Sequence, residues 1–272
     1  MSTRVRLLSA AVLIAVAFSA SPSDAQGSTP SPSVRDYCIK VTPGKAAEFT
    51  AYLHDVAVPL AQARADSGEF AWFAVARGYV PAGTSAPCDY RVMYGYKGDP
   101  PEEISTEGLE VALKRAKLAL TADQLIAKRS SLTTLVALED WGQIERVGPP
   151  AEKGSYLEIY HDKVPPDDWD EWLRLERRWK AYVDAYLKAG GKGAWGLYQL
   201  YGPGGDSMPY NGASVNVFPD WNGLLQEWGA PQELWLKVHP DMTFDEFVRR
   251  HRKTHSTHDI QVYKIVEFVR AK

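Results

Sequence analysis

The stretch AWFAVARGYVP at Ala71–Pro81 returns as AWGLYQLYGPG at Ala194–Gly204 in the second half of this 272-residue chain. A second pair, TADQLIAKR at Thr121–Arg129 and TFDEFVRRH at Thr243–His251, has nearly the same spacing: 123 positions separate Trp72 from Trp195, and 122 separate Thr121 from Thr243. Similarity at a fixed period indicates a repeated structural unit. We therefore predict an internal duplication, with a first repeat over residues 35–147 and a second over residues 154–272.

Each repeat has the pattern strand, helix, strand, strand, helix, strand. Alternation predicts strands over residues 37–42, 71–80, 90–96 and 132–141, and again over 156–162, 194–202, 213–218 and 260–269. Turn and capping residues predict helices over 43–68 and 121–130, and over 165–190 and from 243 onward. This order is the ferredoxin-like βαββαβ unit, whose helices cover one face of its sheet. The expected fold class is therefore α+β, with two fused units burying their open faces against each other.

This element order and duplication resemble the dimeric α+β barrel superfamily, in a fused form where one polypeptide supplies both halves. The resemblance covers roughly residues 35–270 and rests on architecture, not on a signature motif. Members include cofactor-free monooxygenases, haem-degrading enzymes, chlorite dismutases, dye peroxidases, muconolactone isomerases and regulatory ligand-binding domains. The resemblance thus implies an α+β barrel without selecting a function.

The first 25 residues have the layout of a signal peptide. Arg4 and Arg6 precede an apolar run over residues 7–18, and a Ser-x-Ala site ends at Ala25. An uncleaved membrane anchor would need a longer apolar run. Residues 26–34, rich in Ser and Pro, suit a flexible leader. We expect a periplasmic or secreted protein with no stable membrane insertion after cleavage.

Composition limits the partners of the chain. The formal net charge of −3 argues against general nucleic-acid binding, and a 45% hydrophobic content supplies a packed core. The only two cysteines, Cys38 and Cys88, favour a disulfide in an exported protein. However, the predicted strand order places them several residues out of register, too far apart for a bridge. Their pairing stays open at this point, as does further oligomerisation.

A histidine tract, RRHRKTHSTHD, contains His251 and His255 on the inward stripe of the predicted helix that starts near Phe244. Imidazoles at i and i+4 can share a metal or bind haem iron. The surrounding Arg and Lys residues disfavour a bare cation and would attract an anion. A basic helix end that complements the helix dipole is the structural alternative.

The second repeat holds seven of the nine tryptophans. Those on the predicted helix over 165–190 suit core packing, because aromatic side chains bury large areas. The insert over 218–235 is broken by Gly223, Gly229 and Pro231, which predicts a loop-like cover over a pocket for an apolar ligand. Packing of a long connection over the barrel explains the same residues.

Polar residues also occur on strands that should be buried on both faces. Glu158, Tyr160 and His161 lie on one strand, and Lys40, Arg91, Tyr94 and Tyr96 occupy the first repeat. Buried polar groups gathered in a pocket are typical of a ligand site, although single members are more often structural. The predicted ligand-binding residues are Tyr160, Trp195, Tyr198, Gln199, Asn216 and Trp228.

Three functional hypotheses follow from these features. The leading hypothesis is an exported barrel protein that binds a small molecule in an apolar aromatic pocket of the second repeat. Such a protein could also be an enzyme. A haem- or metal-dependent oxidoreductase using His251 and His255 is the second, and a noncatalytic envelope interaction protein is the third. No phosphate-binding glycine loop, nucleophile elbow or spaced cysteine zinc site is present in the sequence.

Overall fold

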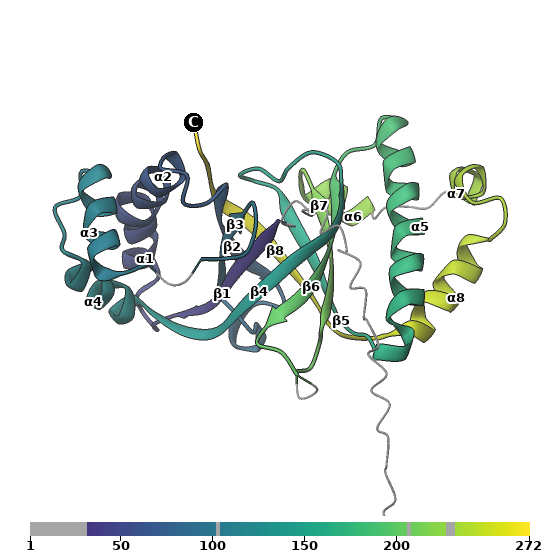
Figure 1. Ribbon diagram of the computed structural model, residues 1–272, viewed down its shortest axis with the longest axis horizontal. Helices are drawn as coiled ribbons and strands as arrows, with labels where there is room; N and C mark the ends of the chain where they lie inside the picture. Colours follow the sequence, from purple (N-terminus) through teal and green to yellow (C-terminus); the bar gives the residue numbers. More distant parts are fainter. Residues whose placement is uncertain (1–31, 102–103, 206–207, 227–231) are drawn as a thin grey trace, which may run out of the picture.

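Eight antiparallel strands close into a barrel in the order β1-β3-β2-β8-β5-β7-β6-β4 (Figure 1). The computed structural model describes residues 32–101, 104–205, 208–226 and 232–272, so the predicted signal peptide lies outside the described residues. The strands are β1 (Ser33–Val41), β2 (Trp72–Val80), β3 (Tyr90–Tyr96), β4 (Thr133–Val147), β5 (Tyr156–Lys163), β6 (Ala194–Gly202), β7 (Gly212–Phe218) and β8 (Ser256–Arg270). Closure pairs every strand on both sides and removes exposed sheet edges. The mixed α+β class is confirmed.

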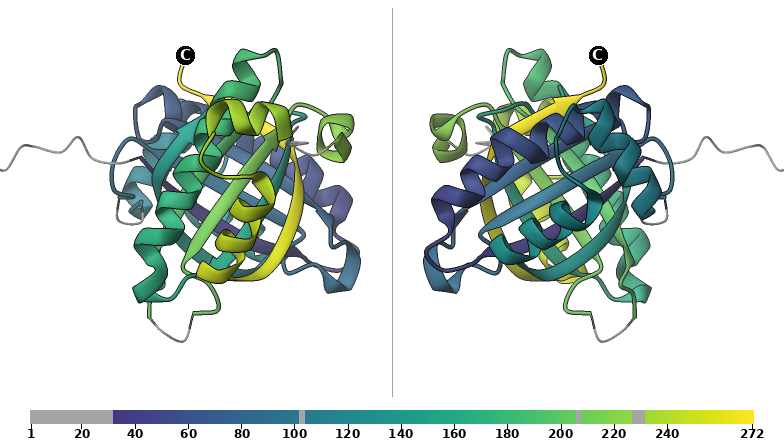
Figure 2. Two further views of the ribbon diagram at one scale, coloured as in Figure 1. Left: turned by 90° about the vertical axis from the view of Figure 1, so that its right-hand side faces the viewer. Right: turned by 90° about the vertical axis from the view of Figure 1, so that its left-hand side faces the viewer.

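Two helical lobes flank the barrel on opposite sides (Figures 1 and 2). The first lobe contains α1 (Ala46–Tyr52), a π-helical turn (Leu53–Ala57), α2 (Val58–Asp66), α3 (Thr106–Arg115) and α4 (Ala122–Leu132). The second contains α5 (Trp169–Lys188), α7 (Gln232–Val238) and α8 (Phe244–Thr254), while α6 (Trp221–Gln226) lies against β5 and β7. Each lobe covers the outer face of one half of the barrel, which leaves the inner face to a separate layer of side chains.

Thr121 and Thr243, which the sequence comparison aligned, each cap a helix. The Thr121 hydroxyl accepts a hydrogen bond from the Gln124 backbone N–H, and the backbone N–H of Thr121 donates to Oε1 of the Gln124 side chain. Thr243 likewise accepts from the Glu246 backbone N–H at 3.2 Å. Such caps satisfy otherwise unpaired amides at a helix N-terminus and stabilise it by about 1 kcal/mol. The repeated Thr-x-x-Gln/Glu pattern therefore marks helix starts.

The first four strands and the last four have the same spatial order, β4-β1-β3-β2 and β8-β5-β7-β6. β2 and β6 begin 122 positions apart, as do β3 and β7. This spacing pairs Trp195 with Phe73, and not with Trp72 as the sequence comparison suggested. Phe73 and Trp195 both pack under helices, whereas Trp72 packs inside the barrel. A shift of one residue along a strand moves a side chain to the opposite face.

Cys38 and Cys88 form a disulfide with a Cα–Cα distance of 5.2 Å. The register argument against this bridge was wrong because Cys88 precedes β3 and does not continue its extended line. The backbone N–H of Asp89 donates to the carbonyl of Ile39, which turns the preceding residue toward the barrel interior. Both cysteines belong to the apolar cluster inside the barrel.

The insert after β7 is helical where the sequence predicted a loop-like cover. It contains α6 and α7, separated by residues 227–231, which lie outside the described part of the chain. Trp235 on α7 is completely buried among α5 and α8 side chains, and its indole N–H donates to the Met242 carbonyl. This tryptophan is therefore core. Among the described residues, no helix combines the length and apolarity that crossing a bilayer requires.

Candidate functional site

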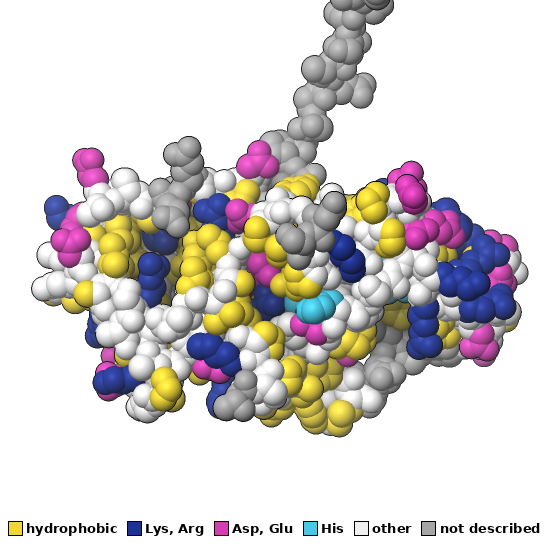
Figure 3. Space-filling view, turned by 90° about the horizontal axis from the view of Figure 1, so that it is seen from below, with side chains coloured by type: hydrophobic (Ala, Val, Ile, Leu, Met, Phe, Trp, Pro, Cys, Tyr) yellow, Lys and Arg dark blue, Asp and Glu magenta, His cyan; other side chains and the backbone are white. Residues whose placement is uncertain are grey.

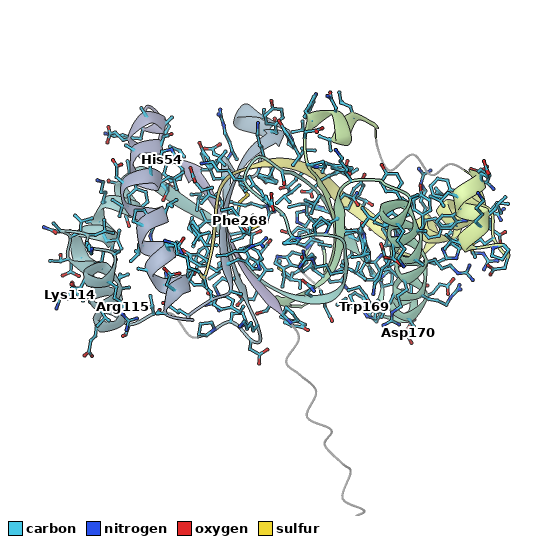
Figure 4. All side chains as sticks on the ribbon, turned by 90° about the horizontal axis from the view of Figure 1, so that it is seen from above. His54, Lys114, Arg115, Trp169, Asp170 and Phe268 are labelled. Atoms are coloured by element: carbon cyan, nitrogen blue, oxygen red, sulfur yellow. A yellow bond between two sulfur atoms is a disulfide. The ribbon has the colours of Figure 1, made fainter. Side chains whose placement is uncertain are left out.

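The barrel encloses a cavity of about 390 Å³. Alternation along the strands directs one set of side chains inward, and small residues such as Ala74, Gly196 and Ala213 leave the centre open. Figure 4 labels Phe268 over the barrel, between the two lobes. The apolar wall contains Val34, Trp72, Met93, Trp141, Leu157, Ile159, Val215, Val217, Ile265 and Phe268. A cavity of this size and character suits a small, largely apolar molecule.

One part of the cavity wall is polar and centres on Arg91 of β3. The Arg91 guanidinium is 3% exposed and lies 2.5 Å from Asp36 Oδ2 and 3.3 Å from Glu139 Oε2. Burial raises the pKa of Asp36 to about 6, although the Arg91 charge acts in the opposite direction. Two carboxylates share a single guanidinium, so a proton on one of them relieves an excess of buried negative charge.

His161 of β5 joins this polar cluster from the second half of the chain. Its Nδ1 lies 2.6 Å from Asp259 Oδ1, and its Nε2 lies 3.4 Å from Arg91 Nη2. Burial lowers the pKa of His161, which favours a neutral imidazole. A neutral ring that donates from Nδ1 to Asp259 presents Nε2 as an acceptor to Arg91. The His161 ring is stacked on Tyr210 at 4.5 Å, which fixes its plane.

Two buried polar atoms at this site have no hydrogen-bond partner among the described residues: Asp36 Oδ1 and Arg91 Nε. Both residues line the cavity. An unpaired buried polar atom costs about 1–3 kcal/mol, so native structures rarely retain one without a function. An acceptor and a donor side by side can engage a ligand that offers a donor and an acceptor in return. A carboxylate with a pKa near 6 can also exchange a proton close to neutral pH.

No family model and no curated protein matches this chain. Solved structures do. A "putative monooxygenase" from Fusobacterium nucleatum subsp. nucleatum ATCC 25586 has a TM-score of 0.54 at 8% identity, over 89% of this chain and 95% of that one. A "putative monooxygenase" from Lactobacillus acidophilus NCFM has the same score and identity, over 88% and 96%. The chain shares their fold. Identity this low shows fold alone: a mixed α+β chain with a closed antiparallel barrel, which is consistent with the α+β barrel expected from the sequence.

The six predicted ligand-binding residues are divided between different parts of the structure. Tyr198 lines the barrel cavity. Trp195 also borders it, but its indole packs in the core under α5 and donates to Ser214 at 2.8 Å. Tyr160, Gln199 and Asn216 are not among the residues that line this cavity. Trp228 lies outside the described residues.

The two predicted metal-binding histidines lie together beneath α5. Their ring centroids are 4.5 Å apart, although α8 ends at Thr254 and His255 is already extended. His251 Nε2 contacts Glu176 at 2.8 Å, and His255 Nε2 lies 3.5 Å from Asp162. Burial lowers the pKa of His255 to about 4 and raises that of Asp162 to about 7. Within the described ranges, no group of three or more His, Cys, Asp or Glu side chains is arranged to hold a metal ion.

Sequence reasoning recognised Arg91 and His161 as polar residues on buried strands but did not include them in the predicted site. It passed over Asp36 because the predicted strand began at Tyr37, whereas β1 begins at Ser33. The available signal was the alternation itself. Asp36 and Cys38 share a face of β1, so an inward cysteine implies an inward aspartate.

Proposed function

We propose that this chain is an exported small-molecule-binding protein whose ligand occupies the barrel cavity. We further propose that the barrel arose by fusion of two ferredoxin-like units. The common strand order of the two halves and their 122-residue spacing support this origin. The predicted signal peptide and the Cys38–Cys88 disulfide support export, because disulfides persist mainly outside the reducing cytosol.

The observation that carries ligand binding is the pair of unpartnered buried atoms, Asp36 Oδ1 and Arg91 Nε, on the wall of a mainly apolar cavity. We infer a small, mostly apolar ligand with one weakly acidic group. Arg91 would hold the acceptor atom of that group, and Asp36 would accept its proton.

An enzymatic role would use the same pair for proton transfer. Asp36 takes a proton from the bound molecule through Oδ1 and becomes a neutral acid, while the electron pair stays on the ligand as an anion. The buried Arg91 N–H stabilises that anion. His161 and Asp259 position Arg91 through the Nε2 contact at 3.4 Å. Each group here belongs to the chain itself, so the step needs no co-reactant.

Native mass spectrometry of the exported protein, recovered from periplasm or medium, tests this proposal. We expect a small-molecule adduct on the wild type and none on Ala74→Phe, because Ala74 is buried on the cavity wall and a phenyl group would fill the space. Ala127→Phe, at an exposed position of α4, is the matched control and should keep the adduct. Circular dichroism would show that both variants fold. An unloaded wild type, or an adduct retained by folded Ala74→Phe, counts against the barrel site.

A visible absorption spectrum of the same sample addresses the haem hypothesis. A Soret band that disappears in His251→Ala would favour the oxidoreductase and displace the present proposal. If the wild-type protein carries no adduct and takes up no haem, the result would instead favour a noncatalytic envelope interaction protein.

A further inference from the structure

A second cavity, of about 410 Å³, lies outside the barrel between the first helical lobe and the sheet. Its walls come from α1, α2, α3 and α4 on one side and from β1, β2, β3 and β4 on the other. Seen from below, the first half of the molecule is hollowed, with hydrophobic walls and basic side chains in the recess (Figure 3). The main apolar lining residues are Ile39, Phe49, Leu53, Leu60, Phe73, Val92, Ile104, Leu109 and Leu125.

The corresponding layer of the second half is packed. There, Trp172, Trp195 and Trp235, each at most 1% exposed, fill the space between the sheet and helices α5, α7 and α8. Both tryptophans of the first half, Trp72 and Trp141, face the barrel interior and contribute nothing to their own helical layer. The two halves share a strand order but differ in this filling, so the first-half cavity is a specific difference between them.

The charge around the second cavity is basic. Its lining contains Arg35, Arg64 and Arg129 against one carboxylate, Glu69. Arg64 pairs with Glu69 at 2.9 Å, and Arg35 pairs with Asp140 at 2.8 Å. The guanidinium of Arg129, on α4, forms no ion pair or hydrogen bond with any residue in the described part of the chain; only the Arg129 backbone carbonyl is engaged, by Thr133. One guanidinium thus remains available to an anion.

Two phenol groups lie near this guanidinium, which is itself exposed. Arg129 is close enough to Tyr52 and Tyr94 for its charge to act on both phenols. Burial raises the pKa of Tyr52 to about 12, so the phenol keeps its proton near neutral pH and can donate a hydrogen bond. Ile126 and Leu135, which are 41% and 53% exposed, extend the apolar lining to the surface. A hydrocarbon chain can therefore enter beside a fixed positive charge.

We propose that this second cavity binds an elongated apolar molecule ending in a carboxylate, with the carboxylate paired with Arg129. A guanidinium recognises carboxylate by charge-assisted hydrogen bonds, and the apolar walls take up the chain. This site is separate from the barrel cavity, and its occupation does not depend on the function proposed for that cavity.

Calorimetric titration with laurate and with dodecanol, its uncharged analogue, tests the site. We expect one laurate per chain, and about tenfold weaker laurate binding in Arg129→Gln, because a charge-assisted hydrogen bond is lost. Dodecanol binding should change less than twofold in that variant. Arg115→Gln, a matched change at an exposed arginine outside both cavities, should leave laurate binding unchanged.

Two cavity-filling variants separate the sites. Ala57→Phe, in the second cavity, should abolish laurate binding, while Ala74→Phe, in the barrel, should not affect it. The proposal is overturned by an absence of saturable laurate binding, by an equal effect of Arg129→Gln on laurate and dodecanol, or by laurate loss in Ala74→Phe alone. A barrel adduct that persists in Ala57→Phe keeps the two proposals independent.

Discussion

Glu139 on β4 and Gln261 on β8 hold the same guanidinium, Arg91, from the two halves of the barrel, at 3.3 Å each. Each also accepts a hydrogen bond from the aromatic residue two positions further along its strand: from Trp141 at 3.2 Å and from Tyr263 at 2.5 Å. The halves thus place a carboxylate and an amide at matched positions around one charge. Together with Asp36, this arrangement leaves two carboxylates on one arginine. Burial is the main cause of the raised pKa of Asp36, and the charge of Glu139 adds to it.

Removing the guanidinium should destabilise the protein strongly. In Arg91→Met, the buried carboxylates of Asp36 and Glu139 lose their counter-charge, and breaking a buried pair in this way costs about 3–5 kcal/mol. Urea unfolding at pH 8, above the pKa of Asp36, measures the loss. Arg115→Met, at an exposed position of α3, is the control and should change the free energy of unfolding by less than about 0.5 kcal/mol. Equal stability of the two variants would show that Arg91 does not neutralise this cluster.

The contribution of Asp36 to stability should fall as the pH rises from about 4 to about 6. Its pKa is raised to about 6 in the folded chain from 3.8, so in this interval the native state binds more protons than the unfolded state. The Asp36 penalty is therefore absent at low pH and complete above pH 6. It can reach about 3 kcal/mol, since each pKa unit is worth about 1.4 kcal/mol. Asp162, whose pKa is raised to about 7, acts in the same direction.

Asp36→Asn isolates the Asp36 contribution. Unfolding free energies measured at pH 4, 5, 6, 7 and 8 should show the wild type losing stability relative to this variant up to about pH 6 and no further. Asp162→Asn should show its own difference extending to about pH 7. Parallel profiles for wild type and Asp36→Asn would mean that Asp36 titrates normally.

Local patterns predicted the elements of the fold well but could not bring the site residues together. The strand over residues 90–96 was predicted with its observed bounds, and Thr121 was placed at the start of its helix. These features depend on alternation and capping within a few residues. The contact between Arg91 and His161 joins residues 70 positions apart through the closure of the barrel, which no local pattern encodes.

Register explains the remaining differences between prediction and structure. His161 faces inward while Tyr160, its neighbour, is not on the cavity wall, and both are polar. A strand covered on both faces shows no clean hydrophobic alternation, so the inward face cannot be identified from such residues. The location of the tryptophans was a similar problem. Their abundance indicated burial, but the structure was needed to show that they fill one lobe, whereas the other lobe retains a cavity.

The tryptophan-filled layer should tolerate truncation poorly. Trp235→Ala removes a fully buried indole that packs on Tyr182, Phe244 and Phe247, and it leaves the Met242 carbonyl without its donor. A large-to-small change of this kind costs about 3–5 kcal/mol. Leu225→Ala, at a side chain that is 64% exposed on α6, provides the contrast and should be nearly neutral. Thermal unfolding followed by circular dichroism measures both, and a neutral Trp235→Ala would contradict a core role.

Opening the Cys38–Cys88 disulfide should lower stability without changing the barrel. The bridge links residues 50 positions apart, and closing a loop of that length restricts the unfolded chain by about 2–4 kcal/mol. In oxidised protein unfolded in guanidinium, a thiol reagent should detect no free cysteine. The double variant Cys38→Ala/Cys88→Ala should unfold at a lower urea concentration than the wild type. Reductant should shift the midpoint of the wild type toward that of the double variant and leave the double variant unchanged. Two reactive thiols in unreduced, exported protein would instead show that the cysteines stay free, and the support that the disulfide lends to export would be lost.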